Sequence, residues 1–227
     1  MRYLLAGLAL GLAVAPLSAN NLVTNGDFSD GATGFVTTYS DVISPGTEDQ
    51  GSYAVLANPA ALPGCSGCFP SVGDHTSGTG NMLLVNTANT NSGAFWSQAF
   101  VVAANTDYLL SFWATSLGGI GLKPNLMVTV NAQPLLGTGE LPYFDPGTPW
   151  LNFTQSWNSG SATSVILSFF SVDLGNPYND FALDDISFAS VSAPAAVPEP
   201  ASWSLMMGGF ALLGGALRAR RPARAFA

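Results

Sequence analysis

The central part of this chain alternates polar and apolar residues with a period of two, and this pattern limits the folds open to it. Gly, Pro, Asn and Asp interrupt the alternation at short intervals, and no segment has the 3.6-residue apolar periodicity of an amphipathic helix. The clearest alternation is in residues 107–116, where one face would carry Tyr108, Leu110, Phe112 and Ala114. The pattern predicts an all-β domain with these four residues in its core.

Ten segments have the length and composition of strands. They are residues 21–24, 34–40, 52–57, 81–87, 94–102, 107–116, 126–130, 150–157, 164–172 and 181–189. So many short strands in one domain favour two packed sheets. Segment 164–172 is apolar on both faces, which predicts a central strand that is covered on both sides.

The first nineteen residues have the composition of a secretory signal peptide. Arg2 supplies a positive charge, residues 4–14 form a short apolar run, and Ala19 offers a small residue for cleavage before Asn20. A retained N-terminal anchor is the alternative, but the apolar run is short for a membrane span. We expect a signal peptide at residues 1–19 and a mature domain at residues 20–191.

The C-terminal residues combine three features in a fixed order. A Pro-rich linker at 192–200 ends in Pro198, Glu199 and Pro200. Seventeen uncharged residues follow at 201–217, and the last ten residues, 218–227, contain four arginines. Because arginines beside a membrane span stay in the cytoplasm, this order predicts a transmembrane helix at 201–217 with a basic cytoplasmic tail.

This C-terminal arrangement resembles the PEP-CTERM sorting signal of Gram-negative bacteria, in which a Pro-Glu-Pro motif precedes a short span and a basic end. The motif residues here are Pro198, Glu199 and Pro200. The resemblance implies export, transient anchoring in the inner membrane, processing by an exosortase, and delivery to the cell surface or the extracellular matrix. A plain C-terminal anchor with a Pro-rich stalk is the alternative.

The charge of the exported part limits its partners. Five of the six basic residues lie in the two terminal segments, which leaves Lys123, and only Glu199 of the fourteen acidic residues lies in the tail. The body therefore has 13 acidic residues (14 − 1) against 1 basic residue (6 − 5). Such a surface repels nucleic acid and anionic lipid headgroups, and it suits divalent cations.

Two cysteines, Cys65 and Cys68, lie among Gly and Pro residues with no helical pattern after them. In an exported protein this spacing predicts a disulfide that closes a small loop. Free thiols and redox or metal chemistry are the alternatives. A zinc site would need further His or Cys ligands close by.

Three short stretches resemble jelly-roll carbohydrate-binding modules of the galactose-binding-like class. They are Asn25-Gly26-Asp27-Phe28, residues 106–113, and Leu183-Asp184-Asp185-Ile186. The chain departs from that pattern at Ser29, where the family usually has Glu. The resemblance implies a jelly-roll β-sandwich of two antiparallel sheets, with its first and last strands close together.

The same resemblance implies a structural calcium ion between the first and last strands. Asp27, Asp184 or Asp185, and backbone oxygens near Asn25 are the candidate ligands, with Asp30 as a further candidate, because calcium takes six to eight oxygens. Since Asp184 and Asp185 are adjacent in a predicted strand, only one of them is expected to face the site. Ordinary turn-capping by Asp27 is the alternative.

Aromatic side chains on an outward face would stack on the faces of sugar rings. The candidates for this role are Trp96, Trp113, Tyr143 and Trp150. The alternative is that these rings are part of the core, which is the usual position of large aromatic residues.

Catalysis has little support in the sequence. The single histidine, His75, lies in a loop rich in Gly, Ser and Thr, and no Gly-x-Ser-x-Gly motif is present. A glycosidase would need two facing carboxyl groups, for which Glu48, Glu140 and Asp145 are the candidates. We expect an exported, non-catalytic protein that binds polysaccharide or contributes to exopolysaccharide or biofilm structure. A secreted hydrolase and a purely structural, calcium-stabilised matrix protein are the alternatives.

Overall fold

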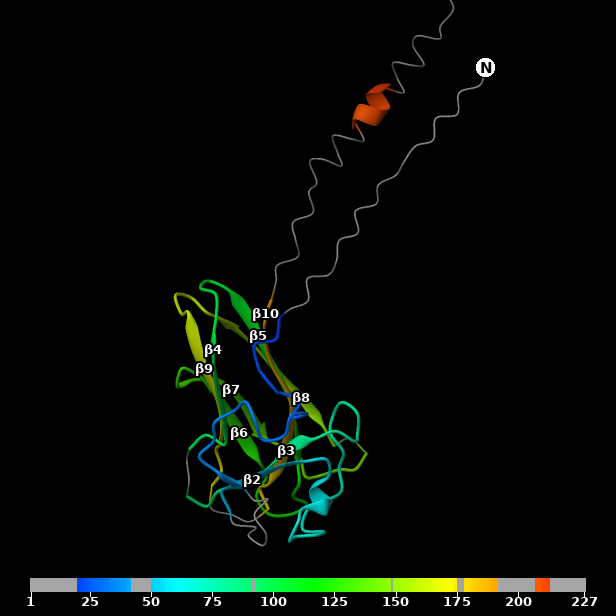
Figure 1. The fold of residues 1–227 in the computed structure, drawn as a ribbon, viewed down its shortest axis with the longest axis vertical. Helices are drawn as coiled ribbons and strands as arrows, with labels where there is room; N and C mark the ends of the chain where they lie inside the picture. The colour runs from blue at the N-terminus through cyan, green and yellow to red at the C-terminus, as the bar shows by residue number, and fades with distance from the viewer. Residues whose placement is uncertain are drawn as a thin grey trace, which may run out of the picture. The chain divides into compact units, whose positions relative to one another are not determined.

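A computed structural model of the chain describes residues 20–41, 50–90, 93–147, 149–174, 178–191 and 207–212 (Figure 1). The chain divides into two compact units, residues 1–191 and 192–227. The expected signal peptide, the Pro-rich linker and most of the expected span lie outside the described residues. Residues 207–212 of the second unit are helical. Among the described residues, no helix has the length and apolar character needed to cross a bilayer.

The first unit is a sandwich of two sheets, as the alternation predicts. The six-stranded sheet has the order β1 (Ser40–Asp41), β2 (Ser52–Leu56), β3 (Met82–Asn86), β10 (Phe181–Ser190), β5 (Asp107–Ser116) and β8 (Leu151–Asn158). The four-stranded sheet has the order β4 (Trp96–Val101), β9 (Ser164–Ser171), β6 (Asn125–Val130) and β7 (Gln133–Glu140). Paired strands are antiparallel except β1 and β2, which are parallel. The all-β jelly-roll class is confirmed.

Large apolar side chains fill the space between the two sheets. The predicted inward face of β5, from Tyr108 to Ala114, lies in this core, and its four apolar residues are at most 3% exposed. Phe112 packs edge-on against Phe169 of β9, with 5.0 Å between the ring centroids. The period-two pattern therefore assigned the faces of β5 correctly.

A second apolar layer covers part of the outer face of the six-stranded sheet. Alternate residues of β2, β3 and β10 point outward there, and they pack under the segment that joins β2 to β3. This segment contains the 3₁₀ turn η1 (Pro59–Ala61) and the disulfide between Cys65 and Cys68. The side chains that it buries are Leu62, Cys65, Phe69 and Val72. Three adjacent strands of this sheet are consequently buried on both faces.

The structure differs from the sequence prediction at three places. Segments 21–24 and 34–40 form only the isolated bridges Asn21–Ala189 and Val36–Ser97, apart from Ser40 in β1. β7 was not predicted. β9 lies between β4 and β6, but the prediction that it is covered on both sides is wrong, because Ile166 is 53% exposed on its outer face.

Candidate functional site

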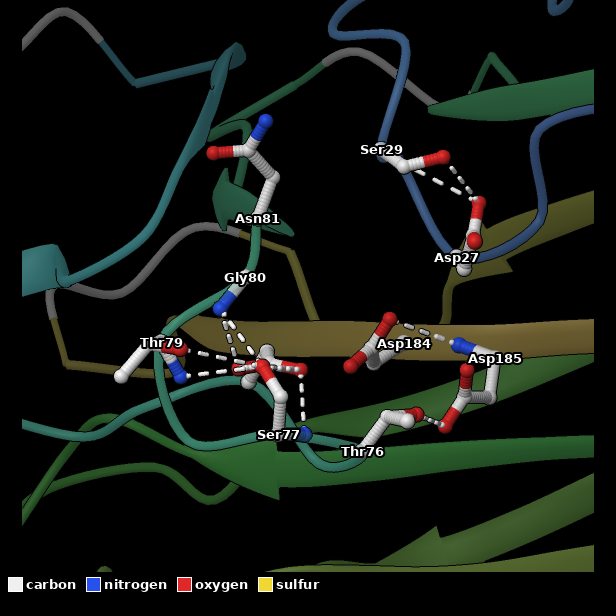
Figure 2. Close-up of a pocket in the computed structure, with 10 residues that line it drawn as sticks. Asp27, Ser29, Thr76, Ser77, Thr79, Gly80, Asn81, Asp184 and Asp185 are labelled. Atoms are coloured by element: carbon white, nitrogen blue, oxygen red, sulfur yellow. Dashed lines mark hydrogen bonds between the residues drawn. The ribbon is translucent and has the colours of Figure 1, made fainter.

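Three segments that are distant in sequence surround one polar cavity on the first unit. They are the opening loop at 25–30, the loop at 73–81, and the middle of β10 (Figure 2). The cavity has a volume of about 430 Å³. It is lined by Asp27, Ser29, Asp74, Thr76, Ser77, Thr79, Gly80, Asn81, Asp184 and Asp185. Apart from Gly80 and Asn81, its lining residues are therefore aspartates, serines and threonines.

The opening loop is packed directly against the backbone of β10. The Ile186 N–H donates to the Gly26 carbonyl at 2.9 Å, and a Cβ atom at position 26 would lie 2.0 Å from the Ile186 carbonyl oxygen. The Asn25 side chain accepts from the Asp30 N–H and donates to the Gly31 and Thr33 carbonyls, which closes the loop on itself. These contacts hold Asp27 over the strand.

A bulge in β10 brings both adjacent aspartates to the same cavity. The pairing of β10 with β5 shifts register between Asp184 and Ser187, and Asp185 has a left-handed φ of 51°. The bulge breaks the alternation of side chains along the strand. The expectation that only one of Asp184 and Asp185 would face the site is therefore wrong.

Asp74 organises the loop at 73–81. Its carboxylate accepts hydrogen bonds from the Ser77 N–H at 2.8 Å, the Gly80 N–H at 2.6 Å and the Ser77 hydroxyl at 2.9 Å. Burial acts to raise the pKa of Asp74, but hydrogen bonds from Ser77, Gly80 and Thr79 outweigh it and hold the pKa below its ordinary value. Asp74 is thus stabilised as an anion on one side of the cavity.

His75 fastens this loop to β10. Its backbone N–H donates to Asp184 at 2.8 Å, its ring Nδ1 lies 2.7 Å from an Asp185 oxygen, and the Thr76 hydroxyl donates to the same oxygen at 2.5 Å. The imidazole ring stacks on Trp113 of β5 with 3.6 Å between centroids and 15° between planes. His75 is thus a structural contact between this loop and the sheet.

Asp184 is the most deeply buried acid of the cavity, with 1% of its surface exposed. Burial raises its pKa to about 7, and the nearby charges of Asp185 and Asp74 act in the same direction. The N–H groups of His75 and Asp185 donate to it and oppose this rise. Four carboxyl groups thus meet in a cavity that is lined by no basic residue, and the most deeply buried of them is shifted toward its neutral form.

The four candidate sugar-stacking rings lie in different environments. Trp96 is fully buried in the core and is not available to a ligand. Trp113 and Trp150 are half-buried, the first stacked on His75 and the second edge-on to it, and the Trp150 indole donates to the Gly73 carbonyl at 3.0 Å. Tyr143 is 42% exposed, and Lys123 lies 5.0 Å above its ring.

The described members of the two candidate carboxylate pairs for a hydrolase, Glu48 with Glu140 and Glu140 with Asp145, do not lie at the cavity. Glu140 is 3.7 Å from the Lys123 ammonium group, and neither it nor Asp145 lines the cavity. Glu48 lies outside the described residues. Among the residues that the structure describes, no group of three or more His, Cys, Asp or Glu side chains is arranged to hold a metal ion.

Sequence reasoning identified Asp27, Asp184 and Asp185 but missed the contribution of the loop at 73–81. Asp74, Thr76, Ser77 and Asn81 all line the cavity. The available signal was Asp74 followed by several hydroxyl residues, a pattern in which Asp forms a local turn. Nothing in that pattern shows which strand the loop will cover.

Comparison with known proteins supports the sorting signal. Residues 196–221 match the PEP-CTERM protein-sorting motif. The chain therefore combines a jelly-roll β-sandwich with a PEP-CTERM signal, which implies export and localisation at the cell surface. A search of curated protein sequences gave no match.

Several solved structures are similar to this chain. The N-terminal CBM22-1–CBM22-2 tandem domain of Xyn10C from Paenibacillus barcinonensis is 13% identical, with 82% of this chain and 49% of that chain covered and a TM-score of 0.47. Family 16 Carbohydrate Binding Module-2 is 15% identical, with 74% and 99% covered and a TM-score of 0.44. TmCBM61, solved with β-1,4-galactotriose, is 13% identical, with 76% and 100% covered and a TM-score of 0.48.

Proposed function

We propose that this protein is a non-catalytic, exported surface or matrix protein that binds polysaccharide through the acidic cavity. The observation that carries the proposal is the convergence of carboxylates from three segments: Asp27, Asp74 and the pair Asp184–Asp185. Hydroxyl and amide groups of Ser29, Thr76, Ser77, Thr79 and Asn81 lie between them. These groups accept and donate the hydrogen bonds that sugar hydroxyls need.

The charge of the domain selects among polysaccharides. The exported part has 13 acidic residues (14 − 1) and 1 basic residue (6 − 5), and like charges repel an anionic polymer. A neutral glycan is therefore the favoured ligand, and an anionic glycan would need a bridging cation. Tyr143 is the remaining exposed ring of the candidate set, but it is not among the residues that line the cavity.

Calcium is the candidate cofactor of the same cavity. Carboxylate oxygens of Asp27, Asp184 and Asp185, with backbone oxygens near Asn25, are the proposed ligands, because calcium prefers six to eight oxygens. The described side chains are not already arranged as a metal site, so binding would require these carboxylates to move closer together. A neighbouring cation would also favour the charged form of Asp184, whose pKa is raised to about 7 by burial. Calcium would thus offset the mutual repulsion of these carboxylates.

The sorting motif supports the proposed route to the surface. Pro198, Glu199 and Pro200 lie within the matched residues 196–221. We infer that the protein is exported by a Gram-negative bacterium, is held in the inner membrane through residues 201–217, and is processed there by an exosortase. A contribution to exopolysaccharide or biofilm structure follows from binding at the cell surface.

Glycan binding with and without calcium tests the proposal. The wild-type chain should retain a subset of neutral glycans on an array, and Asp27→Asn and Asp184→Asn should each weaken retention by roughly tenfold or more. Asp30→Asn is the matched control, because Asp30 lies in the same loop but does not line the cavity. Absence of binding under both conditions would contradict the polysaccharide proposal.

A calcium titration followed by thermal unfolding separates the remaining alternatives. Stabilisation by calcium without glycan binding would favour a structural matrix protein. Release of reducing ends from a retained polysaccharide would favour a hydrolase and contradict the non-catalytic part of the proposal.

A further inference from the structure

β8 is an edge strand without the features that usually prevent strands from pairing between molecules. It ends the six-stranded sheet, and the described residues include no strand hydrogen-bonded to its outer side. Its eight residues pair with β5 along their full length without a bulge. The strand contains no proline and no charged residue. Bulges, prolines and charges are the usual protection of an edge, so β8 is open to another strand.

The outward-pointing backbone groups of β8 belong to its even-numbered residues. The Asp107 carbonyl accepts from the Val191 N–H on the side of β10, so the odd-numbered residues of β5 face β10 and the even-numbered ones face β8. Even residues of β5 pair with odd residues of β8, as Phe112 does with Phe153. The backbone N–H and C=O groups left pointing outward are those of Asn152, Thr154, Ser156 and Asn158.

The sequence of β8 is chemically symmetric about Gln155. On both sides the order is a hydroxyl residue, an aromatic residue and an asparagine. An antiparallel pair related by a two-fold axis through Gln155 would match these chemistries. The matched pairs are Thr154 with Ser156, Phe153 with Trp157, and Asn152 with Asn158.

This register also satisfies the geometry of an antiparallel sheet. Each matched pair joins two even or two odd residues, so both side chains lie on the same face. The outward-pointing even residues become the hydrogen-bonded pairs, and Phe153 and Trp157 form the closer, non-hydrogen-bonded pairs. Aromatic pairs in such positions stabilise sheets.

The aromatic residues of β8 are incompletely covered in the single chain. Phe153 stacks on Phe112 with 5.3 Å between centroids, and Trp157 packs on Phe188 at 5.8 Å, yet both rings are only half-buried. β7 of the other sheet contacts β8 without hydrogen-bonding to it. A second strand alongside β8 would cover these rings further.

We propose that β8 is a homodimer interface in which two copies of this chain pair antiparallel about Gln155. The two six-stranded sheets then form one continuous sheet, joined by about eight backbone hydrogen bonds. Because the domain is strongly acidic and β8 is uncharged, two copies meet with least repulsion at this edge. A strand of unrelated sequence would lack the symmetric match, which favours a second copy as the occupant.

Cysteine crosslinking in the full chain, solubilised in detergent, tests the register. Gln155→Cys places two thiols directly opposite each other across the two-fold axis, and oxidation should yield a covalent dimer. Asn158→Cys is the control, because its two copies would lie six residues apart, or about 20 Å. Equal crosslinking of the two variants, or none at position 155, would overturn the proposal.

Removal of one outward N–H of β8 tests the pairing by a second route. Thr154→Pro deletes an N–H that points away from β5, whereas Thr154→Ala retains it. Light scattering should give a dimer mass for the wild type and Thr154→Ala, and a monomer mass for a folded Thr154→Pro. A monomeric wild type would contradict a β8 interface. A crosslinked dimer of the double variant Thr154→Pro/Gln155→Cys would contradict it as well. The crosslinking result decides the matter if Thr154→Pro fails to fold.

Discussion

Trp113 and His75 lie in van der Waals contact at the point where the loop at 73–81 meets the sheet. The 3.6 Å stacking of their rings occupies a Trp113 face that a sugar would otherwise need. Trp113 therefore holds His75 in place, and with it the neighbouring residues Asp74 and Thr76 that line the cavity.

A double-mutant cycle measures this contact. Trp113→Ala and His75→Ala should each lower the free energy of unfolding, and the double variant should lose less than their sum, with a coupling of about 1 kcal/mol. Urea unfolding of the four proteins gives the coupling. Additive losses would show that the stacked rings do not stabilise each other.

Asp180 provides a separate test of the electrostatics, away from the cavity. Burial raises its pKa to about 6, although its carboxylate accepts a hydrogen bond from the Thr87 N–H at 3.0 Å. Because the folded-state pKa lies above the unfolded value, its stabilising contribution is complete at low pH and is lost as pH rises through about 6.

Asp180→Asn removes this titration and retains an acceptor for Thr87. We expect the variant to gain stability relative to the wild type as pH rises from 4 to 8, by up to about 3 kcal/mol at the upper end. Unfolding free energies at several pH values check the trend. A difference between the two proteins that does not change with pH would contradict it.

At the scale of the elements, the opening loop and the β10 bulge form one unit. Gly26 approaches the Ile186 carbonyl so closely that no side chain fits, and Ile186 follows Asp185 in the bulge. The close approach sets the height of Asp27 above the two aspartates of β10.

Gly26→Ala should therefore displace the opening loop. We expect a loss of about 1–3 kcal/mol in unfolding free energy, together with weaker binding of any ligand that needs Asp27. Gly119→Ala is the matched control, because a Cβ atom there meets nothing within 4 Å and its φ is not left-handed. Equal melting temperatures for the two variants would contradict this role of Gly26.

The elements also show how much the sequence could predict. Alternation predicted β5 with its bounds because one of its faces is regularly apolar and the other carries polar residues. It missed β7, where Pro134, Gly137 and Gly139 give the strand the composition of a turn. It also missed the β10 bulge, because an aspartate with positive φ leaves no periodic signal. The cavity was only half predicted, because nothing in the sequence of the loop at 73–81 shows that it folds over β10.

At the scale of the whole molecule, the excess of acidic residues opposes folding through self-repulsion. Salt screens such repulsion, since the Debye length falls from about 30 Å at 0.01 M to about 8 Å at 0.15 M ionic strength. We expect sodium chloride over this range to raise the melting temperature in the presence of a chelator that removes calcium. Sucrose at matched osmolarity is the control, and an equal effect of both solutes would exclude screening as the cause.

Under the proposed attachment through the C-terminal segment, β10 is the strand that would carry mechanical load. It is an interior strand, bonded to β3 on one side and β5 on the other, and it leads to Val191, whose N–H donates to the Asp107 carbonyl. A pull applied at Val191 would enter β10 at residues 187–190, which pair with β5 on one side and meet Asn21 and Leu22 on the other, because β3 flanks only Phe181–Leu183. The same strand carries Asp184 and Asp185, so a polymer bound in the proposed site and the proposed attachment would load different parts of one strand, and the hydrogen bonds between β10 and β5 would bear most of that load.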